Sequence, residues 1–347
     1  MSRVLIVSSY PPRHCGIGAY ARTQADRLQA AGDDVLVISP TDGDGDVRVP
    51  FDGGRPFREA ALRGGGFDRI VVHFQPALYY RPGARAAVSK VRTSAALLAL
   101  VRRRPQTEIV VHEADPPVRW RPDYALLRRA LARATLVFHT ASLRDALRRQ
   151  YRLPEVRARL VDHTEGVTVY ARPSREQARA RLGVPPDEPV FLCAGFLHPD
   201  KGFDRAVVAF AVAGSPGRLA IVGSVRDATP ENVAWASELR EAARRSPGVD
   251  VREGYVSDED FDAWMAGADR LIVPYRRSWS SGALARARAL GTPALVSAAG
   301  GLPEQAGPGG RVFDTDDELA ALIREAAAEI TAAREASPAA RTGEARP

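Results

Sequence analysis

Lys201 is the residue whose type and position most directly suggest chemistry in this 347-residue chain. It lies in the loop Gly195–Asp204, beside Gly202, between a Val/Leu-rich run and a helix-like run. A lysine ammonium at such a strand-to-helix loop can bind a diphosphate. We therefore predict a phosphate site that includes Gly195 and Lys201, with an ordinary solvated lysine as the alternative.

The loop Ser8–Gly18 is a second place where an anion or a sugar could bind. Gly16 and Gly18 let the backbone approach a ligand closely, and the helix-like run that follows exposes free N–H groups at its start. As a dinucleotide-binding fingerprint the loop is poor, because the third glycine is missing and prolines lengthen the turn. A merely tight turn is the alternative.

A loop rich in serine and arginine precedes another helix-like run in the second half of the chain. Its candidate anion-binding residues are Arg276, Ser278, Ser280, Ser281 and Gly282. Cationic and hydroxyl side chains before a helix N-terminus form a good anion site, and a plain solvated loop is the alternative. The run Ala299–Glu304 adds Gly300, Gly301 and Glu304, although by itself it is more typical of a turn.

Histidines stand where several strand-like runs end. His112 follows one such run beside Glu113, and His73 and Gln75 follow another. An imidazole at a strand end can bind a hydroxyl group or assist proton movement, so His112 is a candidate catalytic residue, with a structural histidine as the alternative. His73, Gln75 and His14 are candidates for a second substrate, whereas His139 and His163 show no specific pattern.

Short apolar runs alternate with helix-like stretches along the whole chain. The runs are Val4–Ser8, Val35–Ser39, Ile70–Phe74, Ile109–His112, Thr135–His139, Leu160–Asp162, Val190–Ala194, Leu219–Gly223, Val249–Arg252, Arg270–Pro274 and Pro293–Ser297. Several are apolar at successive positions, as in strands buried on both faces of a parallel sheet. The alternation predicts doubly wound α/β domains, with ligands at the carboxyl ends of the strands.

The length exceeds what one core usually supports, so we expect two domains. The expected division is 1–170, a linker over 171–188, a second domain over 189–334 and a disordered tail over 335–347. Two distant cysteines predict no disulfide framework and fit a cytoplasmic location. No apolar run approaches the roughly 20 residues of a spanning helix, and the start has no secretory signal pattern.

The order and spacing of these loops resemble the family-4 retaining glycosyltransferases, over the chain to about residue 315. The resemblance implies the GT-B architecture, two Rossmann-like domains that face each other across a cleft. It implies that Gly16 and Gly18 face the donor diphosphate and acceptor and that Lys201 grips the donor phosphates. Tyr255 and Val256, in the turn before a helix that starts at Ser257 or Asp258, would support the nucleotide base. The loop at Ser281 and the pair Gly300–Gly301 would surround the donor sugar and phosphates, with His112 near the sugar. No metal and no cofactor besides the nucleoside-diphosphate sugar are implied.

The sequence departs from the family pattern at three positions. Phe196 stands where the family has a phosphate-binding arginine, a charge that Arg276 or Arg277 could supply from another loop. The two glutamates of the family's Glu-x7-Glu signature, which bind the donor sugar and the ribose, fall at Ser278 and Arg286. Either serine hydroxyls recognise the donor differently, or the chain has lost transferase activity.

The expected function is therefore sugar transfer from a nucleoside-diphosphate sugar to a hydroxyl of a small-molecule, glycan or lipid acceptor, with retention of configuration. A non-catalytic GT-B relative that binds a nucleotide or sugar as a partner subunit is the alternative. A net charge of +7 favours anionic partners. Basic helices over Ala125–Tyr151 leave peripheral contact with the inner membrane face open, beside a solvated charged face. No nucleic-acid partner is expected, because basic–aromatic interleaving is missing. The sequence does not indicate an oligomeric state.

Overall fold

The computed structural model describes residues 1–347 except 81–85, 115, 226–228 and 337–347. The chain divides into two compact units, Met1–Val167 and Thr168–Pro347. The division lies three residues before the expected end of the first domain. Most of the expected tail, from residue 337 onward, lies outside the described residues. None of the helices in the described ranges is both long and apolar enough to cross a bilayer.

The N-terminal unit is built on a parallel sheet of seven strands in the order β3-β2-β1-β4-β5-β6-β7. The strands are β1 (Arg3–Val7), β2 (Asp34–Ser39), β3 (Val47–Arg48), β4 (Arg69–Phe74), β5 (Thr107–Val111), β6 (Thr135–Phe138) and β7 (Ala158–Leu160). In the central strand β1, Ile6 is paired with Val37 on one side and Val71 on the other. Val4–Val7 are all inaccessible to solvent, which explains why this strand is apolar at successive positions.

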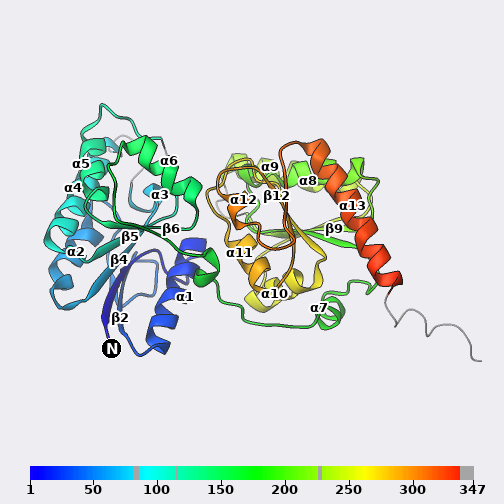
Figure 1. Ribbon diagram of the computed structural model, residues 1–347, viewed down its shortest axis with the longest axis horizontal. Coiled ribbons are helices and arrows are strands. Elements are labelled where there is room, and N and C mark those ends of the chain that lie inside the picture. Colours follow the sequence, from blue (N-terminus) through cyan, green and yellow to red (C-terminus); the bar gives the residue numbers. More distant parts are fainter. Residues whose placement is uncertain (81–85, 115, 226–228, 337–347) are drawn as a thin grey trace, which may run out of the picture. The chain divides into compact units, whose positions relative to one another are not determined.

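Helices cover both faces of this sheet. They are α1 (Gly16–Ala30), α2 (Arg55–Arg63), α3 (Pro76–Tyr79), α4 (Ala86–Arg103), α5 (Pro122–Leu131) and α6 (Ala141–Tyr151). Two short 3-10 turns, Gly64–Gly66 and His163–Gly166, complete the unit. On one side of the sheet α4 packs against both α2 and α5, and α1 lies on the other side (Figure 1). The unit therefore has the doubly wound α/β arrangement that the sequence predicts.

The C-terminal unit is built on a parallel sheet of six strands in the order β10-β9-β8-β11-β12-β13. Its strands are β8 (Val190–Ala194), β9 (Arg218–Gly223), β10 (Val249–Glu253), β11 (Arg270–Val273), β12 (Ala294–Ser297) and β13 (Arg311–Phe313). Its helices are α7 (Arg175–Leu182), α8 (Phe203–Val212), α9 (Pro230–Arg245), α10 (Asp258–Gly267), α11 (Gly282–Ala289), α12 (Leu302–Gln305) and α13 (Asp316–Glu335). Helices α8, α9 and α13 group on one face and α10 and α11 on the other (Figure 1).

The expected strands agree with the observed ones to within one or two residues, except at the sheet edges. The run Leu160–Asp162 was expected as a strand, but β7 spans Ala158–Leu160 and all three of its residues are exposed. The sequence pattern also gave no sign of β3 or β13, which have two and three residues. Edge strands this short bury too few side chains to leave an apolar signature, and so the pattern misplaced or missed them.

The segment expected as a linker, 171–188, belongs to the compact C-terminal unit. Ser174 and Gln177 form a capping box at the start of α7, and Gly183 ends the helix in the left-handed conformation, as the sequence indicates. Helix α7 packs against α10. Its Arg179 is only 2% exposed and donates to Asp269 Oδ2 at 2.8 Å.

Asp269 and Arg179 bind polar atoms of several segments near the amino ends of β8 and β11. Arg179 also donates to the carbonyl oxygens of Gly267 and Glu188, each at 2.9 Å. Asp269 Oδ2 accepts from the backbone N–H of Val190, the first residue of β8. The buried charge is thus compensated by one carboxylate and by backbone dipoles, as a buried ion pair requires.

We predict that Arg179→Met destabilises the C-terminal unit by about 2–4 kcal/mol, because several buried carbonyl groups lose their donor. Asp269 keeps Arg175 and Arg334 as partners, so its charge stays compensated. Arg181→Met on the same helix should change the free energy of unfolding by less than about 1 kcal/mol, because the Arg181–Asp260 pair is exposed. Urea unfolding followed by tryptophan fluorescence measures both, since three of the four tryptophans lie in this unit. Equal effects of the two substitutions would contradict the assignment.

Candidate functional site

The loop after β8 places Lys201 at the carboxyl edge of the six-stranded sheet. The chain leaves the sheet at Gly195, whose φ is +129°, and passes through a 3-10 turn, Pro199–Lys201. Gly202 follows with φ +62° and is the N-cap residue of α8. A Cβ on Gly202 would lie 2.2 Å from the carbonyl oxygen of Pro274 at the end of β11. Only glycine fits there, and this close approach fixes Lys201 beside the loop that follows β11.

The ammonium group of Lys201 rests on an aromatic ring. Its Nζ lies 3.8 Å from the ring centroid of Tyr275, which is 2% exposed. Tyr275 is held by Ser281, whose Oγ is 3.3 Å from the phenol oxygen, and by Ser297, which donates to its carbonyl oxygen at 2.7 Å. Among the described residues no carboxylate forms an ion pair with Lys201. The geometry therefore positions a cation and leaves its charge available to an anion.

Arg276 and Arg277, in contrast, each have a carboxylate partner. Arg276 binds both oxygens of Asp204, at 2.8 and 2.6 Å, and this hydrogen bonding raises the pKa of the guanidinium. Arg277, which is 81% exposed, donates to Asp200 at 3.1 Å. The hypothesis that one of them replaces the family's phosphate-binding arginine stays a prediction, and a ligand phosphate would have to compete with these carboxylates.

The serine loop is shaped mainly by its own hydrogen bonds. Ser278 Oγ donates to the carbonyl oxygen of Ser280 at 2.8 Å. Ser281 caps α11 by accepting from the N–H of Leu284, and its own N–H donates to Gln305 Oε1 at 2.8 Å. Gln305 is buried in α12 and was missed in the sequence, where nothing distinguishes it from a surface amide.

The glycines of this region divide into tight and open positions. Gly300 has φ +56°, and a Cβ there would lie 1.9 Å from the carbonyl oxygen of Ser278, so it fixes one loop against the other. Gly282 and Gly195 have nothing within 4 Å of a Cβ and face open space. Gly301 precedes α12, and Glu304 is exposed on it. A ligand can approach the backbone at the open positions, whereas Gly300 is explained by packing alone.

The turn before α10 presents Tyr255 and Val256. The Tyr255 side chain is 67% exposed and Val256 is half-buried. Ser257 caps α10 by accepting from the N–H of Asp260 at 3.1 Å, as the sequence predicts. The turn has the exposure that a nucleotide base would need, and its role stays a prediction.

Arg286, at one of the two family glutamate positions, holds three segments together. It donates to Asp262 Oδ1 at 2.5 Å and to Asp258 Oδ1 at 2.8 Å, both on α10. Asp262 Oδ2 in turn accepts from the backbone N–H groups of Tyr170 and Ala171 at 2.7 and 2.9 Å. Asp262 is fully buried and was missed in the sequence, where one aspartate in an acidic helix start looks ordinary. The position that the resemblance aligns with one of the family's donor-binding glutamates is here part of an internal ion pair.

In the N-terminal unit, four of the chain's six histidines gather around one tyrosine. His73 lies in β4, and His112, His139 and His163 follow β5, β6 and β7. The ring centroid of Tyr20, on α1, lies 5.1–5.7 Å from each of their centroids. Neighbouring parallel strands end at one edge, and this brings together histidines 24 to 39 residues apart in the chain. The sequence singled out His73 and His112 but not Tyr20, His139 and His163.

Burial favours the neutral form of three of these histidines, His73, His112 and His139. Loss of solvent lowers the pKa of His73 to about 3, and it lowers the pKa values of His112 and His139 as well. His73 bonds to His112 through Nδ1 and Nε2 at 3.0 Å, and His139 Nδ1 lies 3.2 Å from the carbonyl oxygen of Val161. The described residues contain no group of three or more His, Cys, Asp or Glu side chains arranged to hold a metal ion.

The other N-terminal candidates lie in the segment that follows β4 and at or before the start of α1. Gln75 donates to Glu113 Oε2 at 2.7 Å. Gly16 begins α1 and faces open space, whereas a Cβ on Gly18 would lie 3.3 Å from the N atom of Tyr10. His14 is exposed on the loop before α1. Gly16 can therefore admit a ligand, while Gly18 is explained by packing against the strand end.

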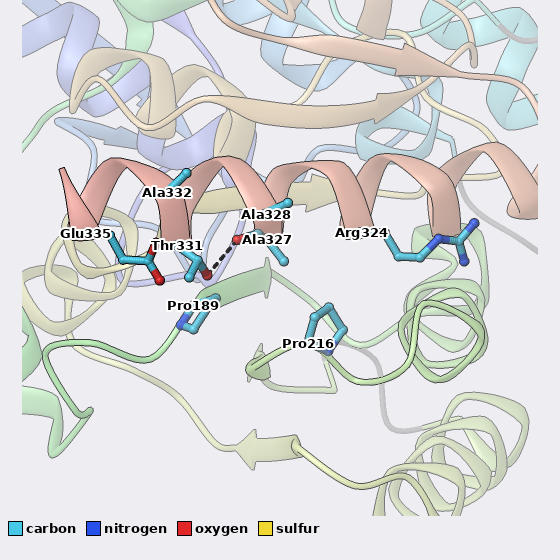
Figure 2. Close-up of a pocket in the computed structure, with 8 residues that line it drawn as sticks. All are labelled: Pro189, Pro216, Arg324, Ala327, Ala328, Thr331, Ala332 and Glu335. Atoms are coloured by element: carbon cyan, nitrogen blue, oxygen red, sulfur yellow. Dashed lines mark hydrogen bonds between the residues drawn. The ribbon is translucent and has the colours of Figure 1, made fainter.

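Lys201 lines neither of two hollows in the C-terminal unit. A groove of 520 Å³ runs beside α13 (Figure 2). Its lining residues are Pro189, Pro216, Arg324, Ala327, Ala328, Thr331, Ala332 and Glu335. Another hollow, of 600 Å³, lies between α9 and the Lys201 loop and includes Asp204 and Arg276. Of the candidate residues only Arg276 contributes to either, so neither hollow marks the predicted site.

The C-terminal unit is similar in sequence to known proteins. Residues 188–329 match the family described as Glycosyl transferases group 1. The chain is 38% identical over 164 residues to the D-inositol 3-phosphate glycosyltransferase of a Nocardioides species, a match that covers 43% of this chain and 36% of the relative. The matched part thus spans about a third of the length of this relative.

Two solved structures show the fold. Sucrose-phosphate synthase from Thermosynechococcus elongatus superposes with a TM-score of 0.70 at 19% identity, covering 96% of this chain and 92% of that one. Anabaena HepE in complex with UDP superposes with a TM-score of 0.67 at 16% identity, covering 96% and 95%. The chain has the GT-B fold, as the sequence resemblance implies.

We predict that the stability of the N-terminal unit falls as the pH is lowered from 6.5 toward 3. The unfolded chain takes up protons at its histidines below about pH 6.5, whereas buried His73 stays neutral until about pH 3, so acid favours unfolding. Each such histidine contributes about 1.4 kcal/mol per pH unit. Hydrogen exchange of peptides from α1, corrected for intrinsic rates, at pH 7.5 and 5.0 measures the change. His73→Gln should reduce the pH dependence of the unfolding free energy by about one proton, and His14→Gln, at an exposed position, should leave it unchanged. Equal protection at both pH values would refute the prediction.

We also predict that restoring the family glutamate by Arg286→Glu destabilises the C-terminal unit by more than about 3 kcal/mol. The new carboxylate would lie against Asp258 and buried Asp262, with no cation left to compensate them. Charge reversal at Arg245, whose pair with Glu241 is exposed, should cost less than about 1 kcal/mol. Urea unfolding compares the two, and a stable Arg286→Glu protein would show that the ion pair is dispensable.

Proposed function

Because residues 188–329 form a Glycosyl transferases group 1 domain in a chain with the GT-B fold, we propose that this protein transfers a sugar from a nucleoside-diphosphate donor to an acceptor hydroxyl. The transfer retains the anomeric configuration and uses no metal cofactor. The acceptor is a small molecule, a glycan or a lipid. The single observation that carries the proposal is the ammonium group of Lys201, fixed on Tyr275 and without a carboxylate partner among the described residues.

Lys201 has the chemistry that a diphosphate leaving group needs. When the bond between the anomeric carbon and the diphosphate breaks, negative charge develops on the phosphate oxygen. A fixed cation stabilises that charge more in the transition state than in the ground state, which lowers the barrier. The N-termini of α8 and α11, and the open backbone at Gly195 and Gly282, provide N–H groups for the remaining phosphate oxygens.

The acceptor oxygen then bonds to the anomeric carbon on the face that the diphosphate leaves. Its proton passes to the departing phosphate oxygen, so no protein carboxylate is needed as a base. We call the sheet edge that carries His73, His112, His139 and His163 the histidine edge. In this proposal it orients hydroxyl groups. His112 is half-buried and its lowered pKa keeps it neutral near pH 7, so it can accept a hydrogen bond from a hydroxyl. His14 and Gln75 stay acceptor-side candidates, whereas His73 is fully buried and cannot touch an acceptor itself.

The second candidate is a GT-B protein that binds a nucleotide or a sugar without turnover. Ser278 and Arg286 occupy the positions of the two family glutamates, and Arg286 is already paired with Asp258 and Asp262. A donor that the family holds by two carboxylates would lose both contacts here. Such a protein would act as a partner subunit, and it would show affinity for a nucleotide without releasing product.

A panel of sugar nucleotides separates the two functions. The purified chain is incubated with UDP-, GDP-, ADP- and dTDP-sugars, with and without inositol phosphate as acceptor, and released nucleotide is measured. Inositol phosphate is the first probe because the Nocardioides relative is named for that acceptor, and UDP-sugars are the first donors because the HepE structure contains UDP. Release that depends on acceptor supports transfer. Raised melting temperature without release supports the binding function.

We predict that Lys201→Ala lowers turnover by about 10²–10³-fold, because the leaving-group charge loses its cation. The matched control is Lys90→Ala. Lys90 is the other lysine of the chain, and its Nζ lies 5.3 Å from the ring centroid of Tyr80 in the N-terminal unit. Its removal should leave turnover within about twofold, with both variants retaining the wild-type circular dichroism. Near-wild-type turnover of Lys201→Ala would remove the proposed role.

A further inference from the structure

A chain of two hydrogen bonds runs from Gln24 on α1 through His73 to His112. Gln24 Oε1 lies 3.0 Å from His73 Nε2, and His73 Nδ1 lies 3.0 Å from His112 Nε2. The two imidazole planes are inclined by only 18°, which suits an in-plane hydrogen bond between ring nitrogens. Gln24 follows Tyr20 by one helical turn, so the two side chains share the face of α1 that covers the histidines. Neither residue was singled out by the sequence.

The Gln24 amide determines which ring nitrogens of His73 and His112 carry a proton. An amide oxygen only accepts, so His73 must donate from Nε2. Fully buried His73 is neutral, and with Nε2 protonated its Nδ1 is a bare acceptor. His112 must then donate from Nε2, which leaves Nδ1 of a neutral His112 without a proton. The chain of bonds therefore has one direction, from His112 through His73 to Gln24.

The Nδ1 atom of His112 is the free end of this chain. No hydrogen bond to it occurs within the described residues, and the His112 side chain is partly accessible. His73 is 0% exposed and cannot reach a substrate. A hydroxyl group that approaches the histidine edge would therefore meet a bare imidazole nitrogen, which is an acceptor and not a donor.

We propose that Gln24 is a positioning residue that fixes the tautomer of His112, so that His112 Nδ1 accepts a hydrogen bond from a substrate hydroxyl. The proposal rests on the proposed function for the identity of that hydroxyl as a sugar or acceptor group. The order of protons does not depend on it. With the Gln24 amide turned by 180°, its N–H group would face His73, every proton would shift, and His112 Nδ1 would become a donor.

Nitrogen-15 NMR of histidine-labelled full-length protein at pH 7.5 reads the protons directly. Long-range proton–nitrogen correlation spectra distinguish protonated from bare ring nitrogens, and His73→Gln and His112→Gln variants assign the signals. We expect Nε2–H tautomers with bare Nδ1 atoms for both His73 and His112. An Nδ1–H tautomer at His112, or an even mixture of the two tautomers, would overturn the proposal whether or not the protein is a transferase.

Three variants of α1 test the role of Gln24. Gln24→Leu removes the oxygen acceptor, and His112 should then show a mixture of tautomers. Gln24→Glu keeps an oxygen acceptor at the same place and should keep the wild-type tautomer. Gln29→Leu, at an exposed position on the same helix, is the control for a leucine on α1 and should change nothing. An unchanged His112 tautomer in Gln24→Leu would overturn the proposal.

Kinetics with the sugar nucleotide that the wild type turns over separates positioning from structure. Gln24→Leu should lower kcat by the factor by which NMR shows the wild-type tautomer of His112 to fall, about twofold for an even mixture, with the donor KM unchanged, because only the correctly protonated fraction of His112 is productive. Gln24→Glu should restore most of kcat. A loss in Gln24→Leu that Gln24→Glu does not rescue, despite a wild-type tautomer, would show that Gln24 acts by another route. If the wild type turns over no donor, the proposed function fails while the NMR result still decides the tautomer.

Discussion

The contact of the Lys201 ammonium with the ring of Tyr275 is the interaction on which the candidate site depends. Most cations beside it are paired with carboxylates, Arg276 with Asp204 and Arg277 with Asp200. A lysine over an aromatic face keeps a fixed position without losing its charge to an acid. The tight approach of Gly202 to the Pro274 carbonyl and the cap at Ser281 maintain that position. The ends of β8 and β11 and the starts of α8 and α11 thus together fix the position of the Lys201 ammonium.

Two arginines of the C-terminal unit have a structural role instead. Arg179 and Arg286 are buried or nearly so, and each holds segments together through aspartates that also accept backbone N–H groups. Planar guanidinium groups suit such multiple bonds better than ammonium groups do. At position 286 this use replaces the carboxylate that the family resemblance implies. The donor's ribose, in the proposed function, must therefore be recognised by other groups.

Neutral imidazoles distinguish the histidine edge of the N-terminal unit from the cationic Lys201 site. Four imidazoles packed around Tyr20 would repel one another if protonated, and burial already disfavours the charged form. Neutral imidazoles instead form directed hydrogen bonds, with Gln24 and the Val161 carbonyl at their ends. The edge is therefore a set of donors and acceptors fixed in direction, suited to hydroxyl groups and not to anions.

The sequence by itself determined the two α/β domains and the order of the loops, because buried parallel strands and glycine loops leave local signals. It also made Lys201 a candidate, whose role stays a prediction. It could not locate the exposed edge strands, nor show that Gly18 and Gly300 serve packing while Gly16 and Gly282 lie open. Only the tertiary structure paired Arg276 and Arg286 with aspartates and gathered His139, His163, Tyr20 and Gln24 with the predicted histidines. Such partners are distant in the chain, and no local pattern records which side chains parallel strands bring to one edge.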